Sequence, residues 1–371
     1  MGMKRILGFD GIRGLSAMAV VLHHLHAWEG ITKSGSIGQA IVPMFGGVAG
    51  VQAFFVLSGF LITTLLASEF ASSGTVSVRR FFIRRSLRIF PLYFGFMIVA
   101  TILFYVDKKV ASPTSLAYGF AYVYNFIPIT AYTAFMGHTW SLAVEEHFYL
   151  IWPWVFLLFF AGRPQVLLLL LVAFIVVSLP LHAALAVSDI GRGYFVDRWT
   201  FTAGFSIAAG CLMALLLKSE QYKERAASFL ASPMALFLAG LIYTLPAFAY
   251  GRSWMFDAVA SGYFRCAGIT LAVGWLVFNQ TSIVSKVLEQ PVLRYLGTIS
   301  YGIYMYQGLF LSTGPIRVAD VFWPLPQHQG IWLLLVAAPL SYHFFELPFL
   351  KMKDRAVVRA HQRAAMGTAL K

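Results

Sequence analysis

The sequence predicts an all-α fold, a polytopic transmembrane helical bundle of about ten spans. Hydrophobic residues make up 59% of the 371 residues and charged residues only 12%, whereas about a quarter of a soluble domain is charged. The mean hydropathy is +0.74, and apolar stretches near the ~20 residues needed to cross a bilayer recur along the whole length. The expected spans are 12–29, 41–67, 89–106, 147–161, 165–187, 200–217, 232–250, 263–279, 299–318 and 329–349.

The first span is expected to stay in the mature protein. Three histidines, His23, His24 and His26, interrupt its apolar run, and no small-x-small cleavage site follows. We therefore read residues 1–350 as one transmembrane domain and residues 351–371 as a basic tail, with no soluble domain appended.

Basic residues predict the orientation of the bundle, since Lys and Arg concentrate in short cytoplasmic loops. A cytoplasmic N-terminus places most of the 28 basic residues inside, including the clusters at 79–88, 218–225 and 351–371. Both termini are then cytoplasmic, as expected for a protein of a bacterial inner (plasma) membrane. The same pattern explains most of the net charge of +13, and no nucleic-acid-binding module is visible.

Residues 110–138 can be interpreted in two ways, because they include an apolar run that could be either a further span or part of an irregular segment. An extra span would move every later basic cluster to the outside. Asn125, Pro128 and several tyrosines also suit irregular backbone, which at membrane depth must be buried in protein or line a cavity. We predict an outer-side re-entrant or capping segment here.

Several kinds of site are not indicated. Cys211 and Cys266 fall inside expected spans, which makes a disulfide framework improbable. We find no zinc-ligand spacing, P-loop, GxSxG elbow or dinucleotide fingerprint, and we expect no metal.

Two polar residues lie along one stripe of the first expected helix. Arg13 and His24 are eleven residues apart, almost three whole turns, so that both lie on one face with roughly 16 Å of rise between them. Polar groups at such depth are candidates for function. A neutral imidazole can accept a proton from a hydroxyl. The alternatives are that Arg13 reaches the inner headgroups and that Asp10 is a helix N-cap.

Five arginines occupy ten residues between the second and third spans: Arg79, Arg80, Arg84, Arg85 and Arg88. They could anchor the chain on anionic lipid. Guanidinium groups also match phosphate oxygens in pairs, and the spacing puts Arg84 and Arg88 on one helical face. A polyphosphorylated cytoplasmic ligand would suit this cluster.

A third cluster runs from His138 to Tyr149 at the expected outer end of the fourth span. Glu145 and Tyr149 share a helical face, whereas Glu146 points elsewhere. The alternative makes Trp140 an interfacial anchor and the two acids a first-turn dipole pair. By contrast, Ser58-Gly59 in the second span is more typical of close helix packing than of catalysis.

Six motifs in order resemble the acyltransferase-3 family, and the resemblance covers essentially the whole chain. They are Phe9-Asp10-Gly11-Ile12-Arg13-Gly14 with His24 eleven residues after the arginine, Phe54-Phe55-Val56-Leu57-Ser58-Gly59-Phe60, Arg84-Arg85-Ser86-Leu87-Arg88-Ile89-Phe90-Pro91, Trp140-Ser141-Leu142-Ala143-Val144-Glu145-Glu146-His147-Phe148-Tyr149, Leu296-Gly297-Thr298-Ile299-Ser300-Tyr301-Gly302-Ile303-Tyr304 and Phe345-Glu346-Leu347-Pro348. The resemblance implies a ten-helix membrane O-acyltransferase, which commonly moves acetyl from acetyl-CoA to a hydroxyl of a sugar, exopolysaccharide, O-antigen, lipid-linked glycan or small natural product. Arg13 and His24 match the family's arginine-and-histidine motif, and Arg85 and Arg88 match its cytoplasmic arginine motif. Gln307 departs from the pattern, because relatives often have histidine there.

The resemblance and the residues together predict a mechanism. His24 would be the general base on the acceptor hydroxyl, Arg13 would orient it or the thioester, and Glu145 would hold the imidazole or bind sugar hydroxyls. Arg84, Arg85 and Arg88 would hold the phosphates of acyl-CoA as co-substrate. The residues expected to bind the acceptor are Asp10, Trp140, Ser141, Glu146 and Tyr149.

Two other classes stay open. Buried Arg, His and Glu side chains also suit a proton-coupled exporter or flippase of a lipid or glycan, although no repeated pair of broken helices is apparent. A structural membrane scaffold would leave the aligned polar groups unexplained.

Overall fold

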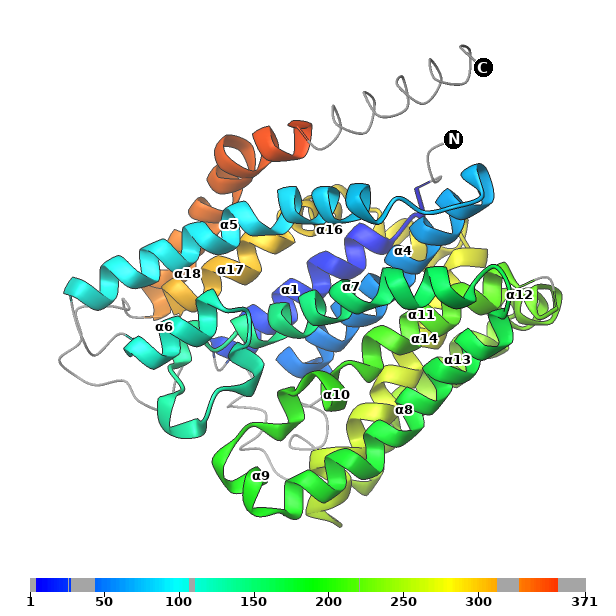
Figure 1. Ribbon diagram of the computed structural model, residues 1–371, viewed down its shortest axis with the longest axis horizontal. Helices are drawn as coiled ribbons and strands as arrows, with labels where there is room; N and C mark the ends of the chain where they lie inside the picture. The colour runs from blue at the N-terminus through cyan, green and yellow to red at the C-terminus, as the bar shows by residue number, and fades with distance from the viewer. Residues whose placement is uncertain are drawn as a thin grey trace.

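The computed structural model describes residues 5–25, 27, 44–106, 111–219, 221–311 and 327–352, with only the backbone of 327–329. Within these ranges the chain is helical, and its one β-bridge joins Pro128 to Tyr194. The helices lie side by side in an elongated bundle (Figure 1). The all-α prediction is therefore confirmed. His26 and most of the predicted basic tail lie outside the described residues.

Each of the ten expected spans coincides with a helix of the structure. These helices are α1 Phe9–His24, α4 Gly47–Ser73, α5 Val78–Val106, α7 Thr139–Phe159, α8 Pro164–Val187, α11 Phe205–Lys218, α13 Pro233–Ala249, α14 Ser261–Phe278, α17 Ser300–Leu311 and α18 Gln327–Leu340. A π-helix, Phe256–Ala260, leads into α14, and another, Ser341–Glu346, extends α18.

Not every helix is long enough to cross a membrane alone. Among the described residues, six pass by length and composition, and a seventh is possible if α12 (Lys223–Ala231) and α13 form one span bent by 80°. The helices α1, α11 and α17 have 16, 14 and 12 residues, whereas about 20 are needed to cross. The protein is thus an integral membrane protein by its helices, and the count of ten spans stays a prediction.

Two helices begin earlier than expected. Helix α5 starts at Val78, so the arginine cluster is helical and not a loop, and Pro91 lies inside the helix. Helix α7 starts at Thr139 rather than near residue 147. Hydropathy marks only the apolar part of a helix, so it misses polar turns at the ends. The consequence is that the arginines and Glu145 both sit on rigid helices.

Helix α4 forms the centre of the bundle and crosses α11 closely. Val56 and Leu66 are fully buried, and α4 is the most buried of the candidate spans. At the crossing, a β-carbon on Gly59 would collide with the carbonyl oxygen of Ile207, and one on Gly210 with that of Val56. These two glycines let the backbones touch, as the Ser58-Gly59 pattern predicted.

The start of α1 packs against two short helices, α15 (Ile283–Leu288) and α16 (Pro291–Thr298). Gly297 of α16 lies directly on the backbone of Asp10, where any β-carbon would collide with the carbonyl group. Two of the sequence motifs, around Arg13 and around Gly297, therefore meet in space.

Residues 111–138 form the irregular segment that the sequence predicted. Helix α6 (Pro113–Phe120) is followed by three short 3₁₀ turns, Tyr124–Phe126, Ile129–Ala131 and Ala134–Met136. Tyr124 holds the segment together, because its hydroxyl bonds Ser115 at 3.0 Å and the carbonyl group of Thr133 at 2.9 Å. Figure 1 shows α6, with the short α9 (Asp189–Gly193), at the end of the bundle away from the N-terminus.

Candidate functional site

Two adjoining cavities lie inside the bundle, one at each end of the Arg13–His24 stripe. The Arg13 cavity has a volume of about 90 Å³ and the His24 cavity about 340 Å³. Val51, Phe55 and Tyr304 line both, so they form a shared wall between them. The stripe on α1 is thus a connection between two chemically different spaces.

The Arg13 cavity gathers charged groups from three helices. Arg13 comes from α1, Arg85 and Arg88 from α5, and Glu145 from α7. Tyr149, another α7 residue of this cavity, is buried, and the Arg85 guanidinium lies on its ring with 3.8 Å between Cζ and the ring centroid. A cation desolvated over an aromatic ring gains roughly 2 kcal/mol. Arg85 is therefore held in place even before any ligand arrives.

A hydroxyl pair connects this guanidinium to the carboxylate. Ser58 and Tyr149 form a short hydrogen bond, and Arg85 Nη2 donates to Ser58 Oγ at 3.4 Å. Glu145 interacts with both hydroxyls and, through its charge, with Arg85 and Arg13. Ser58 is therefore both a packing residue, beside Gly59, and a member of this polar network.

The predicted phosphate-binding arginines separate into two groups. Arg85 and Arg88 line the Arg13 cavity. Arg84 instead pairs with Glu69 of α4 at 3.0 Å, and Arg80 lies 3.5 Å from the same carboxylate. The expectation that Arg84 and Arg88 act from one face is thus not what the geometry favours. The pair that shares a cavity is Arg85 and Arg88.

The predicted site residues of α7 also lie in different parts of the structure. Ser141, Glu145 and Tyr149 line the Arg13 cavity, and the Ser141 hydroxyl bonds the Tyr304 hydroxyl at 2.6 Å. Trp140 lines the His24 cavity. Glu146 lines neither, and its buried Oε1 has no hydrogen-bond partner among the described residues. Glu145 thus lies with Arg13, across the shared wall from the cavity of His24.

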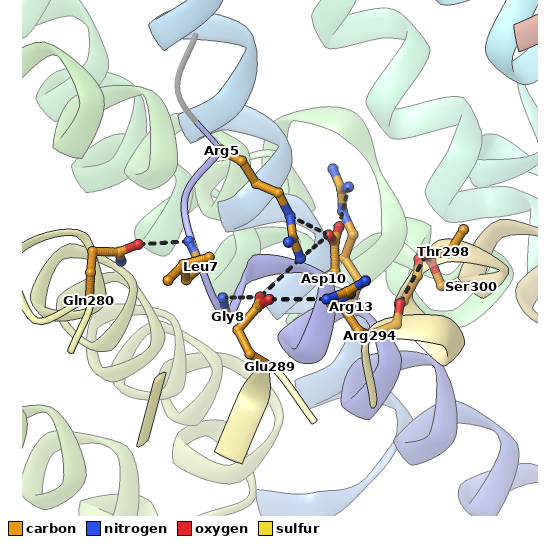
Figure 2. Close-up of polar contacts among 11 residues, drawn as sticks. Arg5, Leu7, Gly8, Asp10, Arg13, Gln280, Glu289, Arg294, Thr298 and Ser300 are labelled. Carbon is orange, nitrogen blue, oxygen red and sulfur yellow. Dashed lines mark hydrogen bonds and ion pairs between the residues drawn. The ribbon is translucent and has the colours of Figure 1, made fainter. Parts of the chain in front are cut away.

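Asp10 belongs to an ion-pair network at the start of α1 rather than to either cavity. Arg5 bonds Asp10 at 2.9 Å and Glu289 at 3.0 Å, and Arg13 lies 3.7 Å from Asp10 (Figure 2). Gly8, with φ +89°, precedes the helix as its N-cap, and its amide donates to Glu289 at 2.7 Å. Asp10 is therefore a first-turn acid and not the cap that the alternative interpretation expected.

The His24 cavity is lined by buried polar groups, several with unused hydrogen-bonding capacity. His24 and His23 end α1, and both have partners elsewhere in the structure. Among the described residues, no partner is found for either ring nitrogen of His138, for either amide atom of Gln307, for Gln52 Oε1 or for Arg265 Nε. Such atoms are rare in protein interiors and call for a ligand or water. A volume of about 340 Å³ is within the usual range for small-molecule sites.

Sequence reasoning had not chosen these last four residues for the site. His138 was noticed only as the start of the third cluster and Gln307 only as a departure from the family pattern, and neither Arg265 nor Gln52 was a candidate. A buried Arg or Gln within an apolar span was the available signal.

His138 precedes α7 and is neutral at physiological pH. Burial, reinforced by the nearby His24, lowers the pKa of the His138 imidazole to about 3. A neutral imidazole offers one donor and one acceptor, which suits a hydroxyl-rich ligand. No cluster of three or more His, Cys, Asp or Glu side chains in the described ranges could hold a metal ion.

Fold and cavities together define an integral membrane protein with a cationic space and a neutral, hydrogen-bonding space meeting inside the bundle. The chain belongs to the acyltransferase family described as "Acyltransferase domain", whose model matches residues 6–344. The match covers nearly the whole chain and confirms the resemblance seen in the motifs. The family is one of transferase enzymes.

The curated relatives carry names consistent with this family. The chain is 28% identical to "Peptidoglycan O-acetyltransferase OatA" of Listeria monocytogenes, with 94% of this chain and 56% of the relative aligned. It is 27% identical to "Putative peptidoglycan O-acetyltransferase YrhL" of Bacillus subtilis, with 96% and 56% aligned. A Staphylococcus aureus relative named as a "Putative O-acetyltransferase" is 26% identical, with 96% and 59% aligned. The chain thus spans less than two thirds of these relatives, and no solved structure matches it.

Proposed function

We propose that the protein is a membrane O-acyltransferase that moves an acyl group, acetyl above all, from acyl-CoA to a hydroxyl of a carbohydrate. The single observation that carries the proposal is the meeting of the two cavities at the shared wall. Cations suited to phosphate line one of them, and a histidine suited to general-base catalysis lines the other.

On the donor side, Arg85 and Arg88 are the proposed phosphate ligands. Both guanidinium groups face the Arg13 cavity, and the basic clusters of the chain favour a cytoplasmic position for this end. A cavity of about 90 Å³ is far smaller than the roughly 300–1,000 Å³ usual for small-molecule sites. Binding of acyl-CoA therefore requires the wall residues Phe55 and Tyr304 to move and admit the thioester.

On the acceptor side, His24 accepts the proton of the attacking hydroxyl. The hydroxyl oxygen forms a bond to the thioester carbonyl carbon, the carbon–sulfur bond breaks, and the leaving thiolate recovers the proton. Arg13 interacts with Glu145 and orients the thioester end, since both line the cavity next to the shared wall. An acyl-histidine intermediate at His24 and direct transfer use the same geometry.

The relatives named for peptidoglycan support a carbohydrate acceptor. Trp140 and Tyr304 add aromatic surface to the His24 cavity, beside the unpartnered polar atoms. Aromatic and hydrogen-bonding groups in one concave site suit a sugar, which has apolar faces and polar edges.

The test is transfer by the purified chain in lipid nanodiscs, supplied with radiolabelled acetyl-CoA and peptidoglycan fragments. His24→Ala should abolish labelling of the acceptor without lowering thermal stability. The matched control, His343→Ala, removes a histidine that lines neither cavity and contacts Tyr295; this variant should keep full activity. Near-normal transfer by His24→Ala would refute the assignment, and substrate crossing vesicle membranes with no transfer would favour an exporter or flippase.

A further inference from the structure

A cationic side chain is buried in the wall of the His24 cavity, and no acidic partner for it is found among the described residues. Arg265 of α14 is 8% exposed, and its Nη1 donates to Ser261 Oγ at 3.2 Å. None of the ion pairs found among the described residues includes Arg265. An arginine stays protonated in proteins, and burying an unpaired charge costs several kcal/mol.

Of the two acids that line the cavity, Asp257 is the nearer to Arg265 in the sequence, and only one of its two carboxylate oxygens has a hydrogen-bond partner among the described residues. Asp257 lines the cavity, and its Oδ2 accepts a hydrogen bond from the Gly251 amide at 2.8 Å. It forms no ion pair with Arg265 among those found in the described residues. Asp257 therefore leaves the guanidinium available to a ligand.

The space beside Arg265 is open because residue 262 is glycine. A β-carbon there would lie 3.2 Å from Gln52 Nε2, 3.8 Å from Arg265 Nη2 and 3.9 Å from Phe205 Cζ. The guanidinium, an amide and an aromatic ring thus converge on one point of the cavity. Gln52 Nε2 donates to the Gly262 carbonyl group at 3.0 Å, and Gln52 Oε1 has no partner in the described ranges.

The second cation of the cavity, Arg198, has an acidic neighbour, because its Nε lies 4.0 Å from Asp197 Oδ2. His138 and Gln307 are 7% and 2% exposed, and they offer donors and acceptors with no partner among the described residues. These two suit hydroxyl or amide groups, whereas Arg265 is the lining cation for which no acidic partner is found in the described ranges.

We propose that Arg265 binds an anionic substituent, a carboxylate or a phosphate, on the acceptor, so that the acceptor is an acidic or phosphorylated carbohydrate and not a neutral one. The acceptor role of this cavity rests on the proposed function; anion recognition by Arg265 does not. The planar guanidinium matches both anions with paired hydrogen bonds.

The test measures the affinity of the full chain in nanodiscs for three sugars that share the glucose ring and differ in charge: glucose, glucuronate and glucose 6-phosphate. Wild type should bind at least one of the two anions tenfold or more tighter than glucose, and the preferred anion tells carboxylate from phosphate. Arg265→Gln should abolish the preference, and Arg265→Lys should keep part of it. The matched control is Arg192→Gln, which changes an arginine 82% exposed in its ion pair with Asp189 and should keep the preference.

The melting temperature of Arg265→Gln distinguishes a ligand-binding role of Arg265 from a structural one. If Arg265 awaits a ligand, Arg265→Gln removes an unpaired buried charge, and its melting temperature should equal or exceed that of wild type. A lowered melting temperature, equal affinity of wild type for all three sugars, or a preference retained by Arg265→Gln would each overturn the proposal. Acetyl transfer from acetyl-CoA is measured in parallel. Arg265-dependent anion binding without transfer would refute the proposed function alone, whereas transfer without anion preference would refute only this inference.

Discussion

Replacing Arg85 by lysine isolates what the Tyr149 ring contributes to donor binding. The substitution keeps the positive charge but loses the planar group that lies 3.8 Å above the ring. The ring holds the guanidinium in place before acetyl-CoA binds, so a lysine that lacks this contact must be ordered during binding. Ordering one long side chain costs up to about 1.5 kcal/mol, and every 1.4 kcal/mol is a factor of ten. The Ser58 contact at 3.4 Å is long and adds little. We expect Arg85→Lys to raise the Kd for acetyl-CoA by about tenfold.

Isothermal titration of the chain in nanodiscs, at low and high salt, checks this value. Arg88→Lys is the matched variant, because Arg88 is exposed at the same cavity and a lysine can still offer its charge there; the Kd should rise no more than about threefold. Arg88→Lys should melt close to wild type, whereas Arg85→Lys should melt at a lower temperature, because its contact with the Tyr149 ring is present without ligand. The reasoning fails if Arg85→Lys binds acetyl-CoA as tightly as wild type, or if the two variants weaken binding equally.

Three further predictions concern stability. Gly59→Ala should lower the free energy of unfolding by about 1–3 kcal/mol in a melting assay, because the added β-carbon forces α4 away from α11. In the same assay the control Gly240→Ala should leave the free energy of unfolding unchanged or raise it, because the space around Gly240 is open. Arg5→Ala should lower the free energy of unfolding by less than about 1 kcal/mol, since the ion pairs of Arg5 are exposed. High salt should reduce this difference in stability between variant and wild type, and a difference that stays the same would contradict the prediction. The His138 imidazole takes up a proton near pH 6.5 in the unfolded state but only near pH 3 in the folded state, because burial lowers its pKa. The free energy of unfolding therefore keeps its full value above pH 6.5 and falls as the pH falls, by about 2 kcal/mol at pH 5. Between pH 7.5 and 5, His138→Gln should therefore lose less stability than wild type, and equal losses would count against the buried neutral imidazole.

The helical bundle could be predicted from the sequence because lipid leaves few alternatives to a helix. Apolar length and basic residues together located a helix at all ten positions, and Pro128 and Asn125 marked the irregular segment. The ends could not be predicted. Val78 and Thr139 begin helices whose first turns are polar, and hydropathy cannot tell a polar helical turn from a loop.

The site was predictable where residues share one helix and not where they meet across helices. Arg13 and His24 follow from the period of α1, and Glu145 and Tyr149 from that of α7. The pairing of Arg84 with Glu69 depends on how α4 and α5 pack, which no spacing encodes. The same holds for Arg265: that no acidic partner for it is found in the described part of the chain is visible only once its neighbours are placed.

The shared wall of Val51, Phe55 and Tyr304 has an electrical consequence. If the cavities open to opposite faces of the membrane, most of the membrane potential falls across these three side chains, because the wall is the thinnest insulating layer on the path. Moving one elementary charge across 100 mV changes its free energy by about 2.3 kcal/mol. In the proposed reaction a proton is taken up beside His24 while a thiolate departs on the Arg13 side, so charge separates across that layer. Acyl transfer in energised vesicles should then change rate with the imposed voltage.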